Sequence, residues 1–482
     1  MSNGVNERFD FNAPLPALDE VHRVHFIAVG GSGMSGVARL MRARGLEVSG
    51  SDNAEVPVLD NLAAEGIGIT IGYEAATAAA LPDGTLVVVS SAIKEDNPEL
   101  SEVRRRGLPV LHRSQGLALV LETRSALAVA GANGKTSTSG IATAALRDLG
   151  RDPSFAIGAE VLGVGANSGV GAGQEFVVEA DESDGSFVVY HPRVAIITSV
   201  KDDHLDFYGT TERLVEAYRA FALTTDPDGL IVCCADDPGS ADLARWARDH
   251  GRTVLTYGTQ EGADVRIEKL AEQGWSAGCL LWDIAGNAHN LQLNVPGFHN
   301  LENAAGVVAA LVYGFGVDSV DAVASVAAFR GTSRRCELKG EIGGIRVVDD
   351  YAHNQGKLAA AVRTGRHLRG DGRLIVVFQP HLYSRTRDQA IGMAEALDGA
   401  DVVLLMNIYG AREQPVEGVT SDLIAQAMRR PCTRTHSAQE TVDLVVTTAR
   451  PGDLVLTVGA GDVTALGPQI LERLAESTSS RT

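Results

Sequence analysis

Long apolar runs are missing from this sequence of 482 residues. No stretch approaches the ~20 consecutive apolar residues that a membrane-spanning helix needs. The first twenty residues are polar and lack the apolar core of a secretion signal. We therefore expect a cytoplasmic protein that has no membrane partner.

Cysteines and basic residues are also scarce. The five cysteines form no C-x-x-C pair and are odd in number, which favours buried thiols in a reducing compartment. Lys and Arg total 42 against 61 Asp and Glu, so the formal net charge is -19. This balance argues against nucleic acid as a partner, although it leaves room for local basic pockets that bind phosphate.

The segment "VAGANGKTSTSG", from Val129 to Gly140, contains a short phosphate-binding pattern, G-x-x-G-K-T. An apolar strand pattern precedes it and a helical pattern follows. Free N–H groups at the start of a helix attract phosphate, and the glycines let the backbone wrap closely. Lys135 can reach the β- and γ-phosphates, and Thr136 can ligate Mg²⁺. The pattern predicts a nucleotide site.

Alternating strand and helix patterns divide the chain into three α/β segments, 1–123, 124–330 and 331–482. The first contains a strand over 24–29, a glycine turn over 30–36, a helix to about Arg44, and a strand ending at Asp52. This unit is of the dinucleotide-binding type, but Ala28 stands where the fingerprint has its first glycine. The expected fold has a Rossmann-like first domain, a central P-loop-type ATPase domain with a parallel sheet, and a Rossmann-like third domain.

Carboxylates and one histidine follow two strand patterns of the central segment. "VVEADESDGSF" places Glu179, Asp181, Glu182 and Asp184 at the end of one strand. Alone, this is equally consistent with a solvated acidic turn. Beside a phosphate loop, a carboxylate that holds Mg²⁺ is what phosphoryl transfer requires. "SVKDDHLDFYG" adds His204 after the next strand, where a metal or phosphate role is the alternative to a structural one.

Polar side chains also mark helix starts and strand ends further along the chain. Asn300 and Asn303 begin a helix, where amides read a nucleobase edge or simply cap the helix. Arg334 and Arg335 begin the third segment and either clamp phosphate or pair with surface acids. A further set follows buried strands and is expected to gather at one cleft mouth, which would suit a carboxylate substrate: Asp349, Asp350, Tyr351, His353, His381, Arg385 and Arg387.

In this order, the motifs resemble the Mur ligase family of peptidoglycan synthesis, from about residue 23 to about 470. The markers are "GGSGMSG", "SGSD", "SSAIKEDNPEL", "GANGKTST", "EADESDGSF", "DHLDFYG", "VPGFHNLEN", "DDYAH", "FQPHLYSRTRD" and "GAGDVT". The resemblance implies an ATP- and Mg²⁺-dependent enzyme that joins an amino acid to the carboxylate of UDP-N-acetylmuramic acid. The carboxylate takes the γ-phosphate, and the amine then displaces phosphate from the acyl phosphate. L-alanine is the first expectation, with glycine and L-serine as alternatives.

The resemblance also implies roles for single residues. It assigns ATP to Gly131, Ala132, Asn133, Gly134, Lys135, Thr136, Ser137, Asn303, Arg335 and Asp350. It assigns the metal to Thr136, Glu179 and His204, and catalysis to Lys135, Glu179, His204 and Arg335. It assigns the UDP-sugar to Gly30, Gly31, Ser32, Gly33, Met34, Asp52, Ser90 and Ser91. It assigns the amino acid to Tyr351, His353, His381 and Arg385.

Several positions depart from the family pattern. The loop has Ala132-Asn133 where T-H is usual, Ala28 replaces a glycine, and Leu382 stands where many relatives carry arginine. The family's H-P-T-E after "DDYAH" is here Asn354-Gln355-Gly356-Lys357, which exchanges an acid for a base. Amino-acid choice therefore stays open. So does the oligomeric state, for which we expect a monomer or a weak homodimer.

Four alternatives remain. One is a ligase that attaches a recycled tripeptide to the same sugar. A second is a folylpolyglutamate synthase-like enzyme, against which the first domain counts. A third is a degenerate paralogue that only binds UDP-sugar or ATP. A nicotinamide-dependent dehydrogenase would rest on the first βαβ unit alone.

Overall fold

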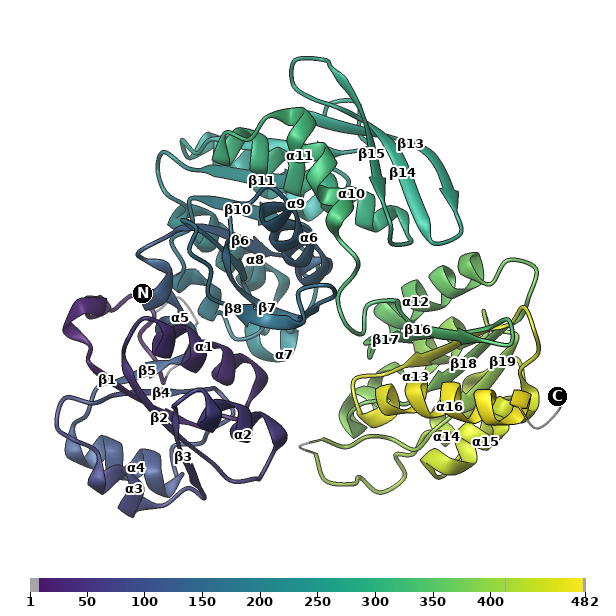
Figure 1. Ribbon diagram of the computed structural model, residues 1–482, viewed down its shortest axis with the longest axis horizontal. Helices are drawn as coiled ribbons and strands as arrows, with labels where there is room; N and C mark the ends of the chain where they lie inside the picture. The colour runs from purple at the N-terminus through teal and green to yellow at the C-terminus, as the bar shows by residue number, and fades with distance from the viewer. Residues whose placement is uncertain (1–7, 412, 480–482) are drawn as a thin grey trace. The chain divides into compact units, whose positions relative to one another are not determined.

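The computed structural model describes residues 8–411 and 413–479 (Figure 1). Strands in this part of the chain form three sheets. The chain divides into two compact units. The first comprises residues up to 271 with 278–294 and 298–330, and the second comprises 272–277, 295–297 and 331–482. The domain boundaries expected from the sequence, after 123 and after 330, stay predictions.

The N-terminal sheet is fully parallel, in the order β3-β2-β1-β4-β5. Its central strands are short runs of buried β-branched residues, the pattern of strands covered on both faces. The strands are β1 (Arg23–Ile27), β2 (Glu47–Asp52), β3 (Gly68–Ile71), β4 (Leu86–Val89) and β5 (Val110–His112). The helices are η1 (Leu18–Glu20), α1 (Ser32–Ala43), α2 (Pro57–Ala64), α3 (Ala75–Ala80), α4 (Pro98–Arg106) and α5 (Arg113–Leu121).

The turn between β1 and α1 is tighter than the sequence predicted. The expected strand over 24–29 ends at Ile27, and α1 begins at Ser32, so Gly33 and Gly36 lie inside the helix rather than in a turn. Ala28 makes the turn with a φ of +70°. Its N–H donates to Ser51 O at 2.9 Å, and its carbonyl accepts from Gly31 N–H at 3.3 Å. The departure at Ala28 therefore places a Cβ in the left-handed region, where glycine carries no steric cost.

Ala28→Gly is expected to stabilise the N-terminal sheet by about 1 kcal/mol, because it removes the cost of a left-handed alanine. The measurement is the urea midpoint of the unfolding transition that includes this sheet. Ala63→Gly is the matched control, since exposed Ala63 lies in the right-handed helix α2 and glycine there costs about 1 kcal/mol. A lower midpoint for Ala28→Gly would show that the turn is not strained.

The central sheet has ten strands in the order β15-β14-β13-β12-β11-β10-β6-β9-β7-β8. The pairs from β13 through β12, β11, β10, β6 and β9 to β7 are parallel, and β7 pairs with β8 antiparallel. Its first strands are β6 (Ser125–Ala130), β7 (Ser154–Val161), β8 (Ala166–Gly169), β9 (Glu175–Glu179) and β10 (Val194–Ile197). They continue with β11 (Leu230–Cys234), β12 (Val254–Gly258), β13 (Val265–Gln273), β14 (Ser276–Trp282) and β15 (Ala288–Leu293).

The helices of the central segment follow its strands, as the sequence predicted. They are α6 (Lys135–Asp148), η2 (Ser186–Val189), α7 (Leu205–Tyr208), α8 (Thr211–Thr224), α9 (Pro238–Asp249), α10 (Phe298–Ala309), η3 (Ala310–Gly314), α11 (Ser319–Ser325) and η4 (Val326–Ala328). Because β9 and β10 both pair with β6, the polar residues that follow these three strands meet at one edge of the sheet. This strand order positions the site described below.

The second unit holds a six-stranded sheet in the order β16-β17-β21-β18-β19-β20. Only the pair of β16 with β17 is antiparallel among the pairs described. The strands are β16 (Glu337–Ile342), β17 (Ile345–Asp350), β18 (Leu374–Phe378), β19 (Val402–Leu405), β20 (Thr433–Arg434) and β21 (Leu454–Val458). The helices are α12 (Gln355–Leu368), α13 (Tyr383–Leu397), α14 (Asp422–Ala427), α15 (Ala438–Thr448), η5 (Asp462–Ala465) and α16 (Leu466–Ser479).

Alternate residues of β18 enter two different cores of this unit. Val376 and Phe378 pack with α12, α13 and α14, whereas Ile375 and Val377 pack with α15 and α16. This alternation is what a strand covered by helices on both faces requires. The doubly covered α/β fold expected for this segment is confirmed.

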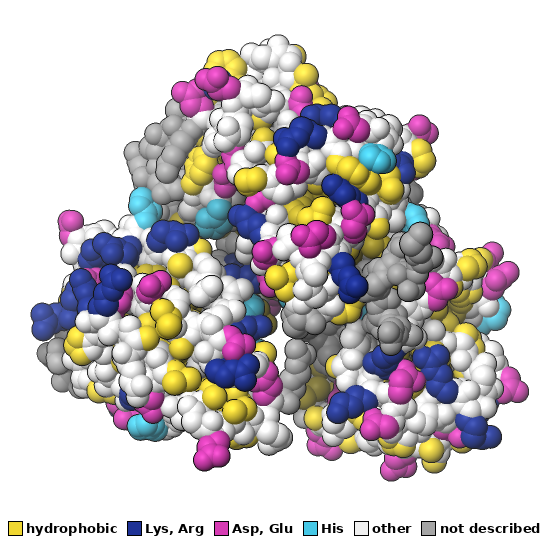
Figure 2. Space-filling view, turned by 180° about the vertical axis from the view of Figure 1, so that it is seen from behind, with side chains coloured by type: hydrophobic (Ala, Val, Ile, Leu, Met, Phe, Trp, Pro, Cys, Tyr) yellow, Lys and Arg dark blue, Asp and Glu magenta, His cyan; other side chains and the backbone are white. Residues whose placement is uncertain are grey.

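Charged side chains of both signs are mixed on the face seen in Figure 2, and Lys and Arg gather on the visible face of the second unit. The net charge of -19 therefore does not mean a uniformly acidic surface. Among the described residues, no helix is both long enough and apolar enough to cross a membrane.

Candidate functional site

The phosphate loop connects β6 to α6, as the sequence predicted. Gly131 and Gly134 have φ values of +137° and +88°. A Cβ on Gly131 would lie 2.1 Å from Thr198 Oγ1, so only glycine fits there. Thr198 Oγ1 donates to Asn133 O at 2.5 Å, and Asn133 N–H donates to Ser199 Oγ at 3.1 Å. The loop is thereby fixed by residues that follow β10.

Helix α6 begins at Lys135 with no side-chain cap, so its first turn offers backbone N–H groups to an anion. Lys135 Nζ donates to Gly131 O at 2.7 Å and lies 2.9 Å from the Glu182 carboxylate. Both side chains are largely buried. Burial lowers the pKa of Lys135, but the carboxylates of Glu182, Asp181 and Glu179 outweigh burial and raise it. Lys135 is therefore a buried cation at the loop, where phosphate oxygens would bind.

Thr136 and Glu179 form the centre of the predicted metal site. Thr136 Oγ1 donates to Glu179 Oε1 at 3.0 Å, and Gly158 N–H donates to Glu179 Oε2 at 2.7 Å. A hydroxyl and a carboxylate beside a phosphate loop fit Mg²⁺, which takes few protein ligands and completes its shell with water and phosphate oxygens. In the described part of the chain, no three His, Cys, Asp or Glu side chains gather as a metal cluster.

His204 lies at the start of the short helix α7 with a φ of +54°. Its Nε2 is 3.8 Å from Asp203 Oδ1. The contacts described for His204 do not join it to Thr136 or Glu179, so its metal role stays a prediction.

Asn303 lies on α10 against the phosphate loop. A Cβ on Gly134 would be 2.9 Å from Asn303 Oδ1, and Asn303 Nδ2 is buried without a hydrogen-bond partner among the described residues. A buried amide without a partner suits a contact with bound nucleotide. The specific contact with adenine stays a prediction.

The acidic segment after β9 divides its carboxylates among several partners. Glu179 accepts from Thr136, Glu182 pairs with Lys135, and Asp184 accepts from Ser91 Oγ at 2.8 Å. Glu182 is 1% exposed at its side chain. Sequence reasoning placed this segment beside the loop but gave Glu182 no role of its own. Glu182 could not be predicted as the partner of Lys135 from the sequence, because their contact depends on β9 lying beside β6.

A cavity of about 590 Å³ lies within the first unit, between the glycine turn and the central sheet. Residues from both segments line it. Those predicted for the UDP-sugar are Gly30, Gly31, Gly33, Met34, Asp52 and Ser90, and those from the central sheet include Gly158, Asn167, Ser168, Glu179 and Asp181. Asp52 Oδ2 accepts from Gly30 N–H at 2.8 Å. The side chain of Ser32 lies outside the described residues.

Arg113 and Tyr73 also line this cavity, and sequence reasoning missed both. A Cβ on Gly33 would lie 2.9 Å from Arg113 Nη1, so the guanidinium lies over the first turn of α1. A guanidinium beside a helix N-terminus suits a diphosphate. Ser91 is not among the residues that line the cavity; its hydroxyl faces Asp184 instead.

In the second unit, the residues predicted for the amino acid lie together. The rings of His353 and His381 are 6.1 Å apart, and Arg385 Nη1 lies 3.3 Å from His381 Nδ1. The Tyr351 ring lies 5.1 Å from that of His353. Burial, with the nearby Lys357, lowers the pKa of His353 to about 3, so its ring is neutral at pH 7. The positive charge of Lys357, which stands where the family has an acid, therefore helps to lower the pKa of His353 in this cluster.

Three further residues of the second unit, Arg387, Tyr409 and Leu382, differ in how they relate to the cluster of His353 and His381. Arg387 is exposed and pairs with its neighbour Asp388, and its place in the cluster stays a prediction. Tyr409, which sequence reasoning missed, stacks on His381 at 5.9 Å. Leu382 has a φ of +71°, a strained conformation of the kind that clusters at binding sites.

The arginines and aspartates of the second unit form their own network. Arg334 and Arg335 lie over the Tyr351 ring at 4.8 and 5.1 Å. Asp350 accepts from the N–H groups of Cys336 and Ala352, both at 2.9 Å, and burial raises its pKa. The roles of Arg335 and Asp350 toward ATP stay predictions.

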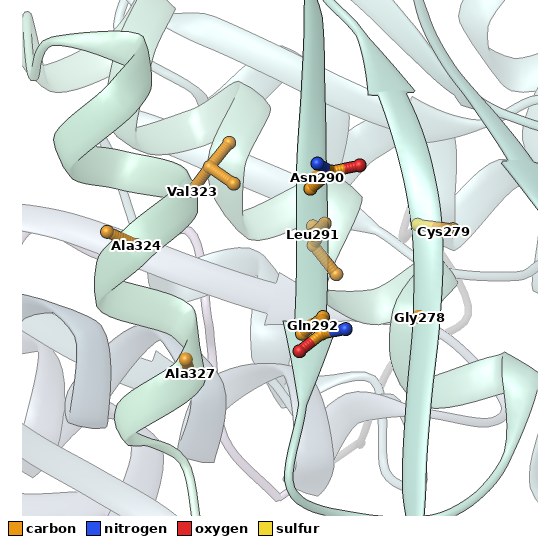
Figure 3. Close-up of a pocket in the computed structure, with 8 residues that line it drawn as sticks. All are labelled: Gly278, Cys279, Asn290, Leu291, Gln292, Val323, Ala324 and Ala327. Carbon is orange, nitrogen blue, oxygen red and sulfur yellow. The ribbon is translucent and has the colours of Figure 1, made fainter. Parts of the chain in front are cut away.

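A separate cavity of about 470 Å³ lies in the central segment between α11 and the edge strands (Figure 3). It is lined by Gly278, Cys279, Asn290, Leu291, Gln292, Val323, Ala324 and Ala327. Burial raises the pKa of Cys279 to about 12, which excludes a thiolate nucleophile there. This cavity offers no charged side chain and is not the site.

Comparison with known family models matches three consecutive segments of the chain. Three family models match it: "Mur ligase family, catalytic domain" at residues 23–124, "Mur ligase middle domain" at 129–311, and "Mur ligase, glutamate ligase domain" at 334–461. The chain is 46% identical to the UDP-N-acetylmuramate–L-alanine ligase of Paenarthrobacter aurescens, covering 95% of this chain and 99% of that protein. It is 47% identical to the ligase of the same name from Kineococcus radiotolerans, covering 96% and 98%.

Solved structures of similar proteins share the fold. The UDP-N-acetylmuramate–alanine ligase of Thermotoga maritima matches with a TM-score of 0.79 and 26% identity, covering 94% of this chain and 99% of that one. A murein peptide ligase of Psychrobacter arcticus matches with a TM-score of 0.69 and 25% identity over the same shares. The matched segments include the phosphate loop, the acidic segment and the aromatic–basic cluster of the second unit, which is formed by Tyr351, His353, His381 and Arg385. This chain therefore belongs to the Mur ligase family.

Proposed function

We propose that this chain is an ATP-dependent ligase that joins L-alanine to the carboxylate of UDP-N-acetylmuramic acid through an acyl phosphate. One observation carries the proposal: Glu179, which contacts Thr136 of the phosphate loop, lines the same cavity as Gly30 and Asp52. A nucleotide held by the loop and a UDP-sugar held by the glycine turn would thus present the γ-phosphate and the carboxylate to one another.

The chain's own residues supply the steps of this reaction. The N–H groups at the start of α6 and the Lys135 ammonium offset the negative charge that gathers on the γ-phosphate as the sugar carboxylate attacks. Thr136 and Glu179 would hold Mg²⁺, which supplies further charge neutralisation at the phosphates. ADP then leaves, the amine attacks the acyl carbon, and phosphate departs. The aromatic–basic cluster of the second unit would orient the amino acid through its carboxylate.

The amino acid and the setting belong to the proposal as well. Relatives at 43–47% identity bear the name of the alanine ligase, which favours L-alanine over glycine or L-serine. A pocket that distinguishes one methyl group gains only ~1–3 kcal/mol, so the choice needs a direct measurement. A cytoplasmic reaction and a monomer or weak homodimer remain the expectations.

A second candidate is the attachment of a tripeptide to the same sugar. It is motivated by the likeness to the Psychrobacter arcticus murein peptide ligase and by the Lys357 exchange. A larger acceptor would need more room beside His353 and His381 than alanine does.

Phosphate release from ATP and Mg²⁺ tests both candidates. UDP-N-acetylmuramic acid is supplied with alanine, glycine, serine or L-alanyl-γ-D-glutamyl-meso-diaminopimelate in separate reactions. We expect release that depends on the sugar and is fastest with alanine. Release with the tripeptide alone would establish the second candidate. Release with none of the four, from folded protein that binds the sugar, would reject catalysis and favour a degenerate paralogue.

A further inference from the structure

A chain of hydrogen bonds connects the N-terminal sheet to the acidic segment after β9. The Ser114 hydroxyl lies 2.8 Å from His112 Nδ1, and His112 Nε2 lies 3.0 Å from Ser91 Oγ. Ser91 Oγ donates to Asp184 Oδ2 at 2.8 Å. Ser91 and Asp184 are 93 residues apart in the sequence. The chain thus joins the two segments that line the 590 Å³ cavity.

The direction of these bonds is fixed by the contacts of His112. Its ring is buried, with Phe9 and Phe11 at 5.1 and 5.5 Å, and burial lowers its pKa to about 4, so it is neutral at pH 7. Nδ1 accepts from Ser114 N–H at 3.3 Å, which leaves the ring proton on Nε2. Nε2–H donates to Ser91 Oγ, and Ser91 donates to the carboxylate. Each donor points toward Asp184, an arrangement in which the bonds strengthen one another.

Asp184 ends a short segment that holds the phosphate loop through its other carboxylates. Glu179 Oε1 accepts from Thr136, and Glu182 pairs with Lys135. Asp184 Oδ1 also accepts from Ser186 N–H at 3.1 Å, which fixes the end of the segment. Residues 179–184 thus connect the Ser91 contact at one end with Thr136 and Lys135 of the phosphate loop. Asp184 contacts both Ser91 Oγ, at 2.8 Å, and His112 Nε2, at 3.5 Å.

We propose that Asp184 is a positioning residue of the ligase reaction: through the Ser91 hydroxyl it fixes the segment whose Ser90 and Ala92 line the cavity and, through residues 179–184, the settings of Lys135 and Thr136. The inference rests on the proposed function. His112 and Asp184 take part in no chemical step. They affect how the sugar and ATP are positioned relative to one another. His112 holds Ser91, and its Nε2 also lies 3.5 Å from Asp184 Oδ2.

A double-mutant cycle of Asp184→Ala and Ser91→Ala tests this proposal. The KM for UDP-N-acetylmuramic acid, the KM for ATP and kcat are measured by phosphate release. We expect each single variant to raise the KM for the sugar about tenfold, as loss of a hydrogen bond to a charged group does. Because Asp184 acts through Ser91, the KM of the double variant for the sugar should exceed that of either single variant by no more than about twofold. A multiplied effect of about 100-fold in the double variant would overturn the proposal.

Three further variants separate positioning from a general loss of structure. Asp184→Asn keeps an oxygen that accepts from Ser91 and should restore most of the sugar KM. Asp228→Ala removes an exposed carboxylate from the turn before β11 and should match the parent protein. If Asp184→Ala does not fold, His112→Asn with Ser91→Ala forms the cycle instead, because both leave the carboxylate in place. Non-additive effects on sugar KM are again expected.

Failure of this inference is distinguishable from failure of the proposed function. Absence of sugar-dependent phosphate release from the parent protein would reject the function. Turnover by the parent protein with additive effects of Asp184→Ala and Ser91→Ala, or with no effect of Asp184→Ala on the sugar KM, would reject only the positioning role.

Discussion

Lys135→Ala should lower phosphate release from ATP by about 10³-fold while leaving the affinity for UDP-N-acetylmuramic acid within about twofold. The ammonium is the buried cation of the phosphate loop, held between Gly131 O and the Glu182 carboxylate. Its removal leaves the developing charge on the γ-phosphate without a fixed counter-charge. Phosphate release measures the first effect, and calorimetry with the sugar in the absence of ATP measures the second.

The control for this substitution is Lys339→Ala. Lys339 lies on β16 of the second unit and pairs with Glu337, so its loss should leave turnover unchanged. Loss of sugar binding by folded Lys135→Ala protein would contradict the assignment of the sugar to the N-terminal glycine turn. Retained turnover would show that the loop lysine does not face the transferred phosphate.

Glu179→Gln should lower kcat by about 10²-fold and raise the Mg²⁺ concentration needed for half-maximal activity by about tenfold. Glutamine matches the shape of glutamate and keeps one oxygen that accepts from Thr136, whereas its NH2 group cannot accept from the Gly158 N–H. The lost negative charge is what a divalent cation requires. The measurement is a Mg²⁺ titration of phosphate release at saturating ATP and sugar.

Glu160→Gln is the matched control, because Glu160 lies exposed on β7, the strand that also contains Gly158. Its Mg²⁺ titration should coincide with that of the parent protein. If Glu179→Gln shifted kcat without any change in the Mg²⁺ requirement, Glu179 would act on Thr136 and not on the metal.

The paralogue that only binds ligands is the least consistent of the alternatives with this geometry. Lys135, Thr136 and Glu179 are in mutual reach, and the loop glycines have the conformations that a phosphate loop requires. The dehydrogenase alternative fails as well, because the family models match the chain beyond the first βαβ unit.

The sequence alone predicted the elements whose signals are local. Buried β-branched runs marked β4, β10 and β18, because such runs suit strands covered on both faces. Gly131, Gly134 and Lys135 identified the phosphate loop. Only glycine adopts the positive φ values of this loop without steric cost, and the lysine that follows supplies a positive charge. The order of motifs along the chain was sufficient for the family.

The tertiary structure alone decided which side chains meet across the sheets. The pairing of Lys135 with Glu182 and of Ser91 with Asp184 spans 47 and 93 residues. The first pair depends on β9 lying beside β6, and the second joins the segment after β4 to the segment after β9; neither arrangement is encoded in a local pattern. For the same reason the sequence did not predict the positions of Arg113, Tyr73 and Tyr409. Each lies in a segment without a distinctive motif, and its surroundings come from residues that are distant in the sequence. Local sterics and periodicity determined the elements, and long-range packing determined the site.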